Sequence, residues 1–334
     1  MKRTIAIACG GDTSEFEVSL RSAQGIYSFI DKEKYTLYIV EMHGPDWHVQ
    51  LPDGTKAPVD RNDFSFRLGG EKVVFDFVYI TIHGTPGEDG RLQGYLDMLH
   101  IPYSCCGVLA AALTYDKFAC NQYLKAFGVR IADSLLLRQG QSVSDEDVIG
   151  KIGLPCFIKP SLGGSSFGVT KVKTREEIQP AIEKAFKEAR EVLVEAFMQG
   201  TEITCGCYKT KDKTVIFPPT EVVTHNEFFD YDAKYNNSDS RTVIPAEVEE
   251  EKTEEMRRIA RKIFRAVDGS GLARVDFFVD KKTGRVLFNE LNTMPGFTPI
   301  SMYPMLWVQA GMTETELMDR FIELALKRDS GIRG

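Results

Sequence analysis

The sequence predicts a mixed α/β and α+β protein that begins with an open parallel sheet. Apolar runs alternate with amphipathic stretches over the first hundred residues, which is the pattern of repeated βαβ units. Farther along the chain, short strands flank single helices, which is typical of α+β units. Since a length of 334 residues suits two or three domains, we divide the chain at 1–112, 113–200 and 201–334.

The N-terminal domain is expected to carry its ligand-binding turns at one edge of the sheet. Its strands and helices are predicted, in order, at 4–9, 15–30, 35–42, 75–82 and 92–99. Open parallel sheets bind ligands outside the carboxyl ends of their strands. The turn at Gly10-Gly11 and the turn at His83-Gly84 are therefore candidate ligand sites.

The central and C-terminal domains are expected to be built from hairpins and single helices. Helices are predicted at 115–127, 176–188, 251–267 and 314–327, and the first of these closes at Gly128. Strands are predicted at 154–159, 169–172, 192–195, 202–208, 272–279 and 285–291, and a polar loop at 225–241.

Composition excludes several classes of protein. No stretch approaches the roughly 20 apolar residues that a membrane helix needs. Seven cysteines without a CxxC pair indicate reduced thiols buried as small hydrophobes, and hence a cytoplasmic protein. A net charge of −7 without a long basic run gives no footprint for nucleic acid, so phosphate must be met by local basic residues.

A glycine-rich segment in the middle of the chain is a candidate phosphate site. The chain has neither a GxxxxGK[ST] loop nor a GxGxxG turn after a strand. The segment from Lys159 to Gly168 joins two predicted strands, and its glycines would let backbone N–H groups close around an anion beside Lys159. A plain hairpin tip is the alternative, because Gly and Ser are common in such turns.

Acidic residues near the C-terminus form the strongest candidate constellation. A hairpin centred on residues 280–284 brings Asp276 within about one residue of Glu290, and Asn292 shares the face of Glu290. Converging oxygen ligands suit magnesium or manganese. Scattered acids on an exposed face are the alternative, although the neighbouring apolar residues favour a buried hairpin.

Two further residues lie at the predicted ligand-binding edge. Glu15 follows Gly10-Gly11 and is placed to bind an ammonium group, but Ser14 with Glu17 also forms a capping box that would explain this segment. His83 stands at a strand end before a glycine-rich loop, where a core role is less expected than for most histidines, and a structural loop role remains open.

Taken together, six segments resemble the D-alanine–D-alanine ligases of the ATP-grasp superfamily, in the family's order from end to end. They are 10–19, 83–90, 159–168, 231–235, 273–276 and 289–296. The resemblance implies the ATP-grasp fold and the ADP-forming ligation of two D-alanine molecules through a D-alanyl phosphate, for peptidoglycan synthesis. It also implies ATP with two Mg²⁺ or Mn²⁺ ions, a homodimer, and no nucleic-acid or membrane partner.

The resemblance assigns roles to particular residues. ATP would lie between the central and C-terminal domains, on Lys117, Lys159, Ser165, Ser166, Glu195, Ala196, Phe197, Met198, Glu202 and Lys234. Within this set, 195–198 would form the adenine hinge and Glu202 would hold the ribose. Many relatives carry lysine where this chain has Ala196, which puts a side-chain contact to adenine in doubt. The metal ligands would be Asp276, Glu290 and Asn292.

The same resemblance assigns the residues around the two D-alanine molecules. Glu15 and His83 would bind and orient the first, while Ser301 and Met302 would line the site of the second carboxylate. Arg274 and the N–H of Gly296 would stabilise the oxyanion. Ser165 and Tyr235 would link the loops that close over the site.

Two other functions compete with this interpretation. The same scaffold could make a D-alanyl ester or a mixed dipeptide, against which Tyr235 argues, because related ester-forming ligases carry phenylalanine there. A non-catalytic amino-acid sensor on an open α/β fold would use Glu15 as its anchor, but would leave Lys159, Arg274, Asp276 and Glu290 without a function.

Overall fold

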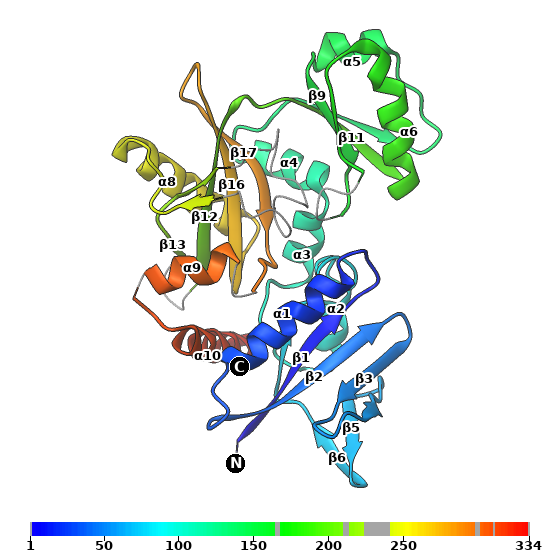
Figure 1. Cartoon of the computed structure of the whole chain (residues 1–334), viewed down its shortest axis with the longest axis vertical. Coiled ribbons are helices and arrows are strands. Elements are labelled where there is room, and N and C mark those ends of the chain that lie inside the picture. Colours follow the sequence, from blue (N-terminus) through cyan, green and yellow to red (C-terminus); the bar gives the residue numbers. More distant parts are fainter. Residues whose placement is uncertain are drawn as a thin grey trace.

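The computed structural model, shown in Figure 1, describes residues 2–163, 168–209, 214–223, 241–297, 301–309 and 311–332. Its N-terminal part is a five-stranded sheet in the order β4-β3-β2-β1-β7. The strands β1 (Arg3–Gly10), β2 (Tyr35–His43) and β7 (Phe77–Ile80) are parallel, as predicted. The structure adds an antiparallel edge, β3 (Asp46–Gln50) and β4 (Lys56–Pro58), which the sequence did not predict.

Helices cover both faces of this sheet. They are α1 (Phe16–Phe29) and α2 (Arg91–Met98). The strands β5 (Ser65–Leu68) and β6 (Glu71–Val74) form a separate hairpin. The aliphatic side chains of α1 pack with Ile5 and Ile7 of β1, whereas those of α2 pack with Ala6 and Ala8. Because successive strand residues point to opposite faces, this alternation buries β1 from Ile5 onward.

The central unit is an antiparallel sheet in the order β10-β9-β11-β8. Its strands are β8 (Ser134–Arg138), β9 (Cys156–Pro160), β10 (Thr170–Val172) and β11 (Glu191–Ala196). Its helical elements are α5 (Asp145–Lys151), η1 (Arg175–Glu177) and α6 (Ile178–Glu188). Figure 1 shows this unit at the end of the molecule opposite the N-terminal sheet.

The C-terminal unit is an antiparallel sheet in the order β15-β14-β12-β16-β17, with β13 also paired to β12. Its strands are β12 (Gly200–Lys209), β13 (Thr214–Ile216), β14 (Thr220–Val223), β15 (Arg241–Val243), β16 (Leu272–Asp280) and β17 (Val286–Asn292). Helix α8 (Glu250–Ala266) packs on it, and α9 (Met302–Gln309) and α10 (Glu314–Ile332) follow.

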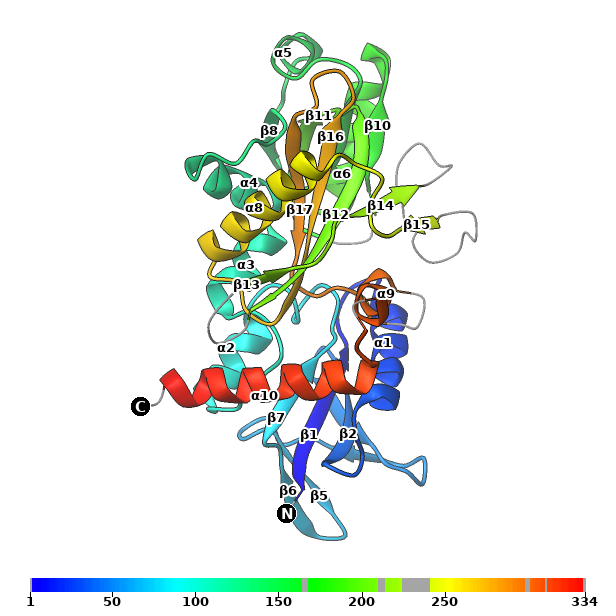
Figure 2. The same cartoon turned by 90° about the vertical axis from the view of Figure 1, so that its left-hand side faces the viewer.

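Helix α10, near the C-terminus, packs against the N-terminal sheet. Its residues Leu317, Met318 and Phe321 share a core with Ile5 and Ile7 of the N-terminal sheet. The same core includes aromatic residues of the C-terminal unit, and Figure 2 shows α10 lying across β1 and β7 beside α1. The N-terminal sheet is therefore held against the C-terminal unit through apolar packing.

One local prediction is confirmed and one is corrected by the structure. The helix expected at 115–127 is α4 (Lys117–Ala126), which Asp116 caps by accepting from the Ala119 N–H. The helix before it, α3 (Val108–Tyr115), was not predicted. The capping box of Ser14 and Glu17 is absent from α1, whose N-cap residue is Glu15 without a side-chain cap. The limits of the three domains remain predictions, and α3 crosses the expected limit at 112.

Two exclusions from composition agree with the structure. All seven cysteines are buried free thiols, as predicted. Across the described part of the chain, no helix is both long enough and apolar enough to span a membrane.

Candidate active site

The hairpin of β16 and β17 brings the predicted metal ligands to one face. Asp276 lies directly opposite Glu290, and Arg274 lies opposite Asn292. Side chains two residues apart share a face of a strand, and opposite residues of an antiparallel pair also share it. A register irregularity after Asp276 follows this group along the strand. The predicted approach of Asp276 to within about one residue of Glu290 is confirmed, but the direct pairing depends on the register shift, since Phe277 lies opposite Phe288. The face also carries Arg274.

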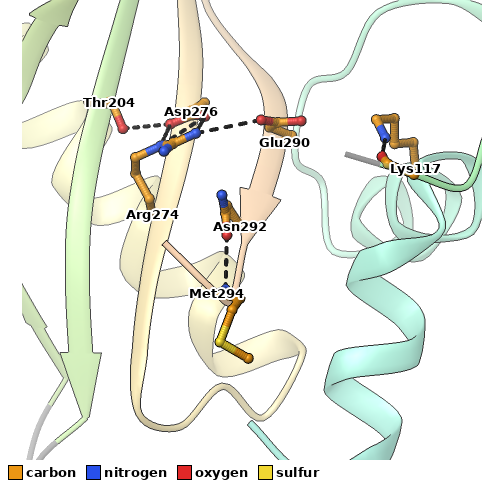
Figure 3. Close-up of polar contacts among 8 residues, drawn as sticks. Lys117, Thr204, Arg274, Asp276, Glu290, Asn292 and Met294 are labelled. Atoms are coloured by element: carbon orange, nitrogen blue, oxygen red, sulfur yellow. Dashed lines mark hydrogen bonds and ion pairs between the residues drawn. The ribbon is translucent and has the colours of Figure 1, made fainter. Parts of the chain in front are cut away.

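Arg274 bridges the two carboxylates of this face (Figure 3). Its Nε donates to Asp276 Oδ1 at 2.8 Å and its Nη2 to Asp276 Oδ2 at 2.7 Å. The same Nη2 lies 3.6 Å from Glu290 Oε1. Burial by itself would lower the pKa of Arg274, but the charge of Asp276 outweighs it and holds the guanidinium protonated. Arg274, which was expected to stabilise the oxyanion, therefore also balances the negative charge of Asp276 and Glu290.

Thr204 completes the environment of Asp276 and was missed from the sequence. It lies opposite Asp276 on β12, and its hydroxyl donates to Asp276 Oδ1 at 2.5 Å. Both side chains are buried. No local signal could identify it, since β12 precedes β16 by some 70 residues in the chain and only the sheet order brings them together.

The donor set of this face fits a hard divalent cation. Among the described residues, no group of three or more His, Cys, Asp and Glu side chains is placed to hold a metal ion. The predicted set contains two carboxylates and the amide oxygen of Asn292, which accepts the Met294 N–H at 2.9 Å. Carboxylate and amide oxygens are ligands suited to Mg²⁺ and Mn²⁺.

The two predicted phosphate-binding lysines come from different elements, β9 and α4. Lys159 of β9 forms an ion pair of 2.6 Å with Glu195 of β11, and both side chains are largely buried. Lys117, the first residue of α4, donates to the Gly163 carbonyl. Ser161 accepts the Lys117 amide through its carbonyl, so α4 is tied to the start of the glycine-rich segment.

The predicted adenine hinge begins in the last two residues of β11, and two of its amides are engaged within the protein. The Ala196 N–H donates to Asp133 O at 2.9 Å and the Phe197 N–H to Pro155 O at 3.4 Å. Phe197 packs on the Phe157 ring, and Met198 follows it. Glu202 lies near the start of β12, opposite Phe278. Base and ribose binding by 195–198 and Glu202 remain predictions.

Glu15 and His83 converge at the edge of the N-terminal sheet. Both are buried, with exposed fractions of 5 % each. His83 Nε2 lies 3.5 Å from the Ser22 hydroxyl of α1. Burial lowers the pKa of His83, and the charge of Glu15 only partly offsets this effect. A neutral imidazole therefore lies beside the carboxylate that the family resemblance assigns to an ammonium group.

The same edge carries Glu88, which the sequence did not single out. Its Oε2 accepts the Gly84 N–H at 2.7 Å, inside the loop that starts with His83. Burial, followed by the charge of Glu15, raises the pKa of Glu88 from 4.5 to about 8. The spacing of His83 and Glu88 in one glycine-rich loop was the available signal.

This raised pKa predicts a pH-dependent stability. Between pH 4.5 and about 8 the folded state keeps a proton that the unfolded chain releases, so the contribution of Glu88 falls as pH rises. We expect Glu88→Gln, which can still accept from Gly84, to lose less unfolding free energy across this range than the native protein. Urea denaturation at several pH values measures it. Glu183→Gln, at an exposed position of α6, serves as control and should follow the native curve.

The remaining predicted residues are only partly placed. Ser301 precedes α9, which starts at Met302, and its Oγ would lie 3.2 Å from a Cβ built on Gly296. This places Gly296 and Ser301 side by side. Ser165, Ser166, Lys234 and Tyr235 lie outside the described residues.

The sequence models of two protein families match consecutive parts of the chain. Residues 4–106 match the D-ala D-ala ligase N-terminus, and residues 123–323 match the D-ala D-ala ligase C-terminus. The chain is 72% identical to the D-alanine–D-alanine ligase of Bacteroides thetaiotaomicron over 97% of its own length and 99% of the relative. The corresponding protein of Bacteroides fragilis is 68% identical with the same coverage.

Solved structures agree in fold over nearly the whole chain. D-alanyl-alanine synthetase A from Vibrio cholerae superposes with a TM-score of 0.87 at 33% identity, covering 97% of this chain and 98% of that one. VanG D-Ala:D-Ser ligase from Enterococcus faecalis gives 0.85 at 30% identity, covering 97% of this chain and all of the other. Since both family models match and the relatives cover nearly the whole chain, the chain belongs to the D-alanine–D-alanine ligase family of ATP-grasp enzymes.

Proposed function

We propose that this enzyme joins two D-alanine molecules at the expense of ATP, through a D-alanyl phosphate, and so supplies D-alanyl-D-alanine for peptidoglycan precursors. The observation that carries this proposal is the cluster of Arg274, Asp276 and Glu290 on one face of a hairpin, in a chain that is 72% identical to a D-alanine–D-alanine ligase. Paired carboxylates suit the divalent cations that neutralise phosphate charge in phosphoryl transfer.

The chemistry requires that the carboxylate be activated before ligation. A carboxylate oxygen of the first D-alanine attacks the γ-phosphorus of ATP, the bond to the bridging oxygen breaks, and ADP leaves. The free amine of the second D-alanine then attacks the carbonyl carbon of the acyl phosphate. The tetrahedral intermediate expels phosphate, and the proton of the attacking amine is lost to solvent or a base.

On the phosphate side, the roles follow from charge and position. Lys117 and Lys159 bind the phosphates of ATP, and Lys159 would then exchange its partner Glu195 for phosphate oxygens. Asp276, Glu290 and Asn292 would hold two Mg²⁺ or Mn²⁺ ions, which would neutralise charge on the transferring group. Thr204 keeps the buried Asp276 carboxylate oriented toward this face.

On the amino-acid side, a second set of residues binds and orients. Glu15 pairs with the ammonium of the first D-alanine, and the neutral His83 orients the same molecule. Arg274 and the Gly296 N–H stabilise the oxyanion of the tetrahedral intermediate, a contribution of about 3–4 kcal/mol for a well-placed donor. Ser301 and Met302 line the site of the second carboxylate. Ser165 and Tyr235 act in loop closure, which excludes water from the acyl phosphate.

Assembly and location follow by analogy with the family. We place the enzyme in the cytoplasm, where its seven buried thiols stay reduced, and expect it to form a homodimer. Sedimentation equilibrium measures the mass in solution, and a single species at 37.5 kDa would contradict the dimer.

Phosphate release tests the proposed function against a sensor role. The purified protein with ATP and Mg²⁺ should release phosphate when D-alanine is added, with one dipeptide formed for each phosphate. L-alanine at the same concentration is the control. Binding of D-alanine without phosphate release would favour a non-catalytic sensor and overturn the proposal.

A structural relative motivates one further comparison of acceptors. VanG is described as a D-Ala:D-Ser ligase, and it shares 30% identity with this chain. Competition of D-alanine with D-serine and with D-lactate, resolving peptide from ester, should give D-alanyl-D-alanine as the main product. Predominant ester would contradict the role that the sequence suggests for Tyr235.

A further inference from the structure

One hydroxyl group joins the two loops that carry Glu15 and His83. The first loop connects β1 to α1, and the second connects β7 to α2. Thr13 Oγ1 donates to the His83 carbonyl at 3.0 Å. The same oxygen accepts the Glu15 N–H at 3.4 Å. Thr13 therefore contacts the backbone of both residues that are proposed to bind the first D-alanine.

The two loops also approach each other closely around this contact. The Asp12 N–H donates to Thr85 O at 2.9 Å. Asp12 precedes Thr13 in the first loop, and Thr85 follows Gly84 in the second. A Cβ on Gly84 would lie 2.5 Å from Thr13 Cγ2, and Gly84 has a φ of +76°. Only glycine adopts this positive φ without strain and leaves room for Thr13 Cγ2. The side chain of Thr13 therefore packs directly against the backbone of Gly84.

The rest of the first loop is fixed from the opposite side by β2 and the turn after it. The Gly11 N–H donates to Met42 O at 2.7 Å. His43 Nδ1 lies 3.0 Å from Gly11 O, and the Gly44 N–H donates to Asp12 Oδ1 at 2.7 Å. These bonds anchor the start of the loop, whereas Thr13 connects its end to the His83 loop.

We propose that Thr13 is a positioning residue for the first D-alanine, with its hydroxyl holding Glu15 and His83 at a fixed separation. The proposal rests on the function proposed for these two residues. A hydroxyl has one proton to donate and lone pairs that accept, so it can serve the His83 carbonyl and the Glu15 amide at once. Valine has the same shape but can do neither, while serine keeps both bonds and loses only the methyl group.

The expected effect is specific to one substrate. The first D-alanine is proposed to contact residues of both loops, so a change in their separation affects its binding. The proposed ATP ligands Lys117 and Lys159 lie on other elements, α4 and β9, so ATP binding is not affected. A lost hydrogen bond corresponds to roughly a 3- to 10-fold change in an equilibrium constant. Thr13→Val should therefore raise the KM of the first D-alanine by roughly 3- to 10-fold and leave the KM of ATP within twofold.

Steady-state kinetics of three variants test the proposal. Thr13→Val is compared with Thr13→Ser, which should keep a native KM for the first D-alanine. Thr55→Val is the matched control, because it removes a hydroxyl from an exposed turn of the same domain. Thermal unfolding is followed for all three. An unchanged KM in Thr13→Val, or an equal rise in Thr13→Ser, would overturn the proposal, as would a parallel rise in the KM of ATP.

A second variant covers the case in which Thr13→Val does not fold. Gly84→Ala introduces a methyl group against Thr13 Cγ2 and forces the same two loops apart. It should raise the KM of the first D-alanine, and a native KM would overturn the proposal. Failure of the proposed function is distinguishable, because it would show as a lack of D-alanine-dependent phosphate release in the native protein.

Discussion

Glu290→Gln is expected to lower the ligation rate by at least about 100-fold while the fold stays intact. The residue faces Asp276 across the hairpin and its side chain is about one-third exposed, so its packing contributes little. Removing one of two carboxylate charges weakens cation binding and phosphate neutralisation together. Coupled phosphate release measures the rate, and circular dichroism measures the fold.

The matched control for this variant is Glu183→Gln, the same chemical change on the exposed face of α6. It should keep native activity and stability. Native turnover in Glu290→Gln would remove this residue from the metal site. Titration with Mn²⁺, followed by its electron paramagnetic resonance signal, gives an independent readout, since the variant should bind the ion more weakly.

Arg274→Met is expected to abolish turnover and also to destabilise the fold. The guanidinium is the partner of Asp276, whose exposed fraction is only 3 %. Breaking a buried ion pair by removing one member costs about 3–5 kcal/mol of unfolding free energy, because the remaining charge is left without its partner. Losing an oxyanion donor lowers kcat by a further factor of about 10²–10³.

Arg274→Lys separates these two effects. It keeps the charge beside Asp276 but cannot make the paired bonds of Nε and Nη2, so we expect most stability to return and most of kcat to remain lost. Nucleotide binding should persist in both variants. Native kcat in Arg274→Lys would show that the fork geometry of the arginine is not needed in the transition state.

The site hairpin could be predicted because its turn lies between the two acids and fixes their register to within about one residue. The period of two puts Glu290 and Asn292 on one face, but Asp276 lies opposite Glu290 only through the register shift between Asp276 and Phe277, which the sequence did not reveal. The pairing of Arg274 with Asp276 obeys the same period, but the sequence could not choose between this ion pair and a position facing a substrate. Thr204 required the sheet order, which a single sequence does not reveal.

At the N-terminal edge, the position of the site was predictable and its local contacts were not. Parallel strands end at a common edge, so Glu15 and His83 were expected near one another. The capping box failed because α1 begins one residue later than the box requires, with Glu15 as its N-cap, so that Glu17 is its second residue instead of its third. The short strands β3 and β4 escaped prediction because runs of three to five residues carry little periodic signal.

Isotope transfer from substrate to phosphate tests the proposed activation most directly. D-alanine labelled with ¹⁸O in its carboxylate is incubated with ATP, Mg²⁺ and the native enzyme, and the released phosphate is analysed by mass spectrometry. Activation as D-alanyl phosphate predicts one ¹⁸O atom in the phosphate for each dipeptide formed. Phosphate without ¹⁸O, at a normal yield of dipeptide, would contradict the acyl-phosphate route.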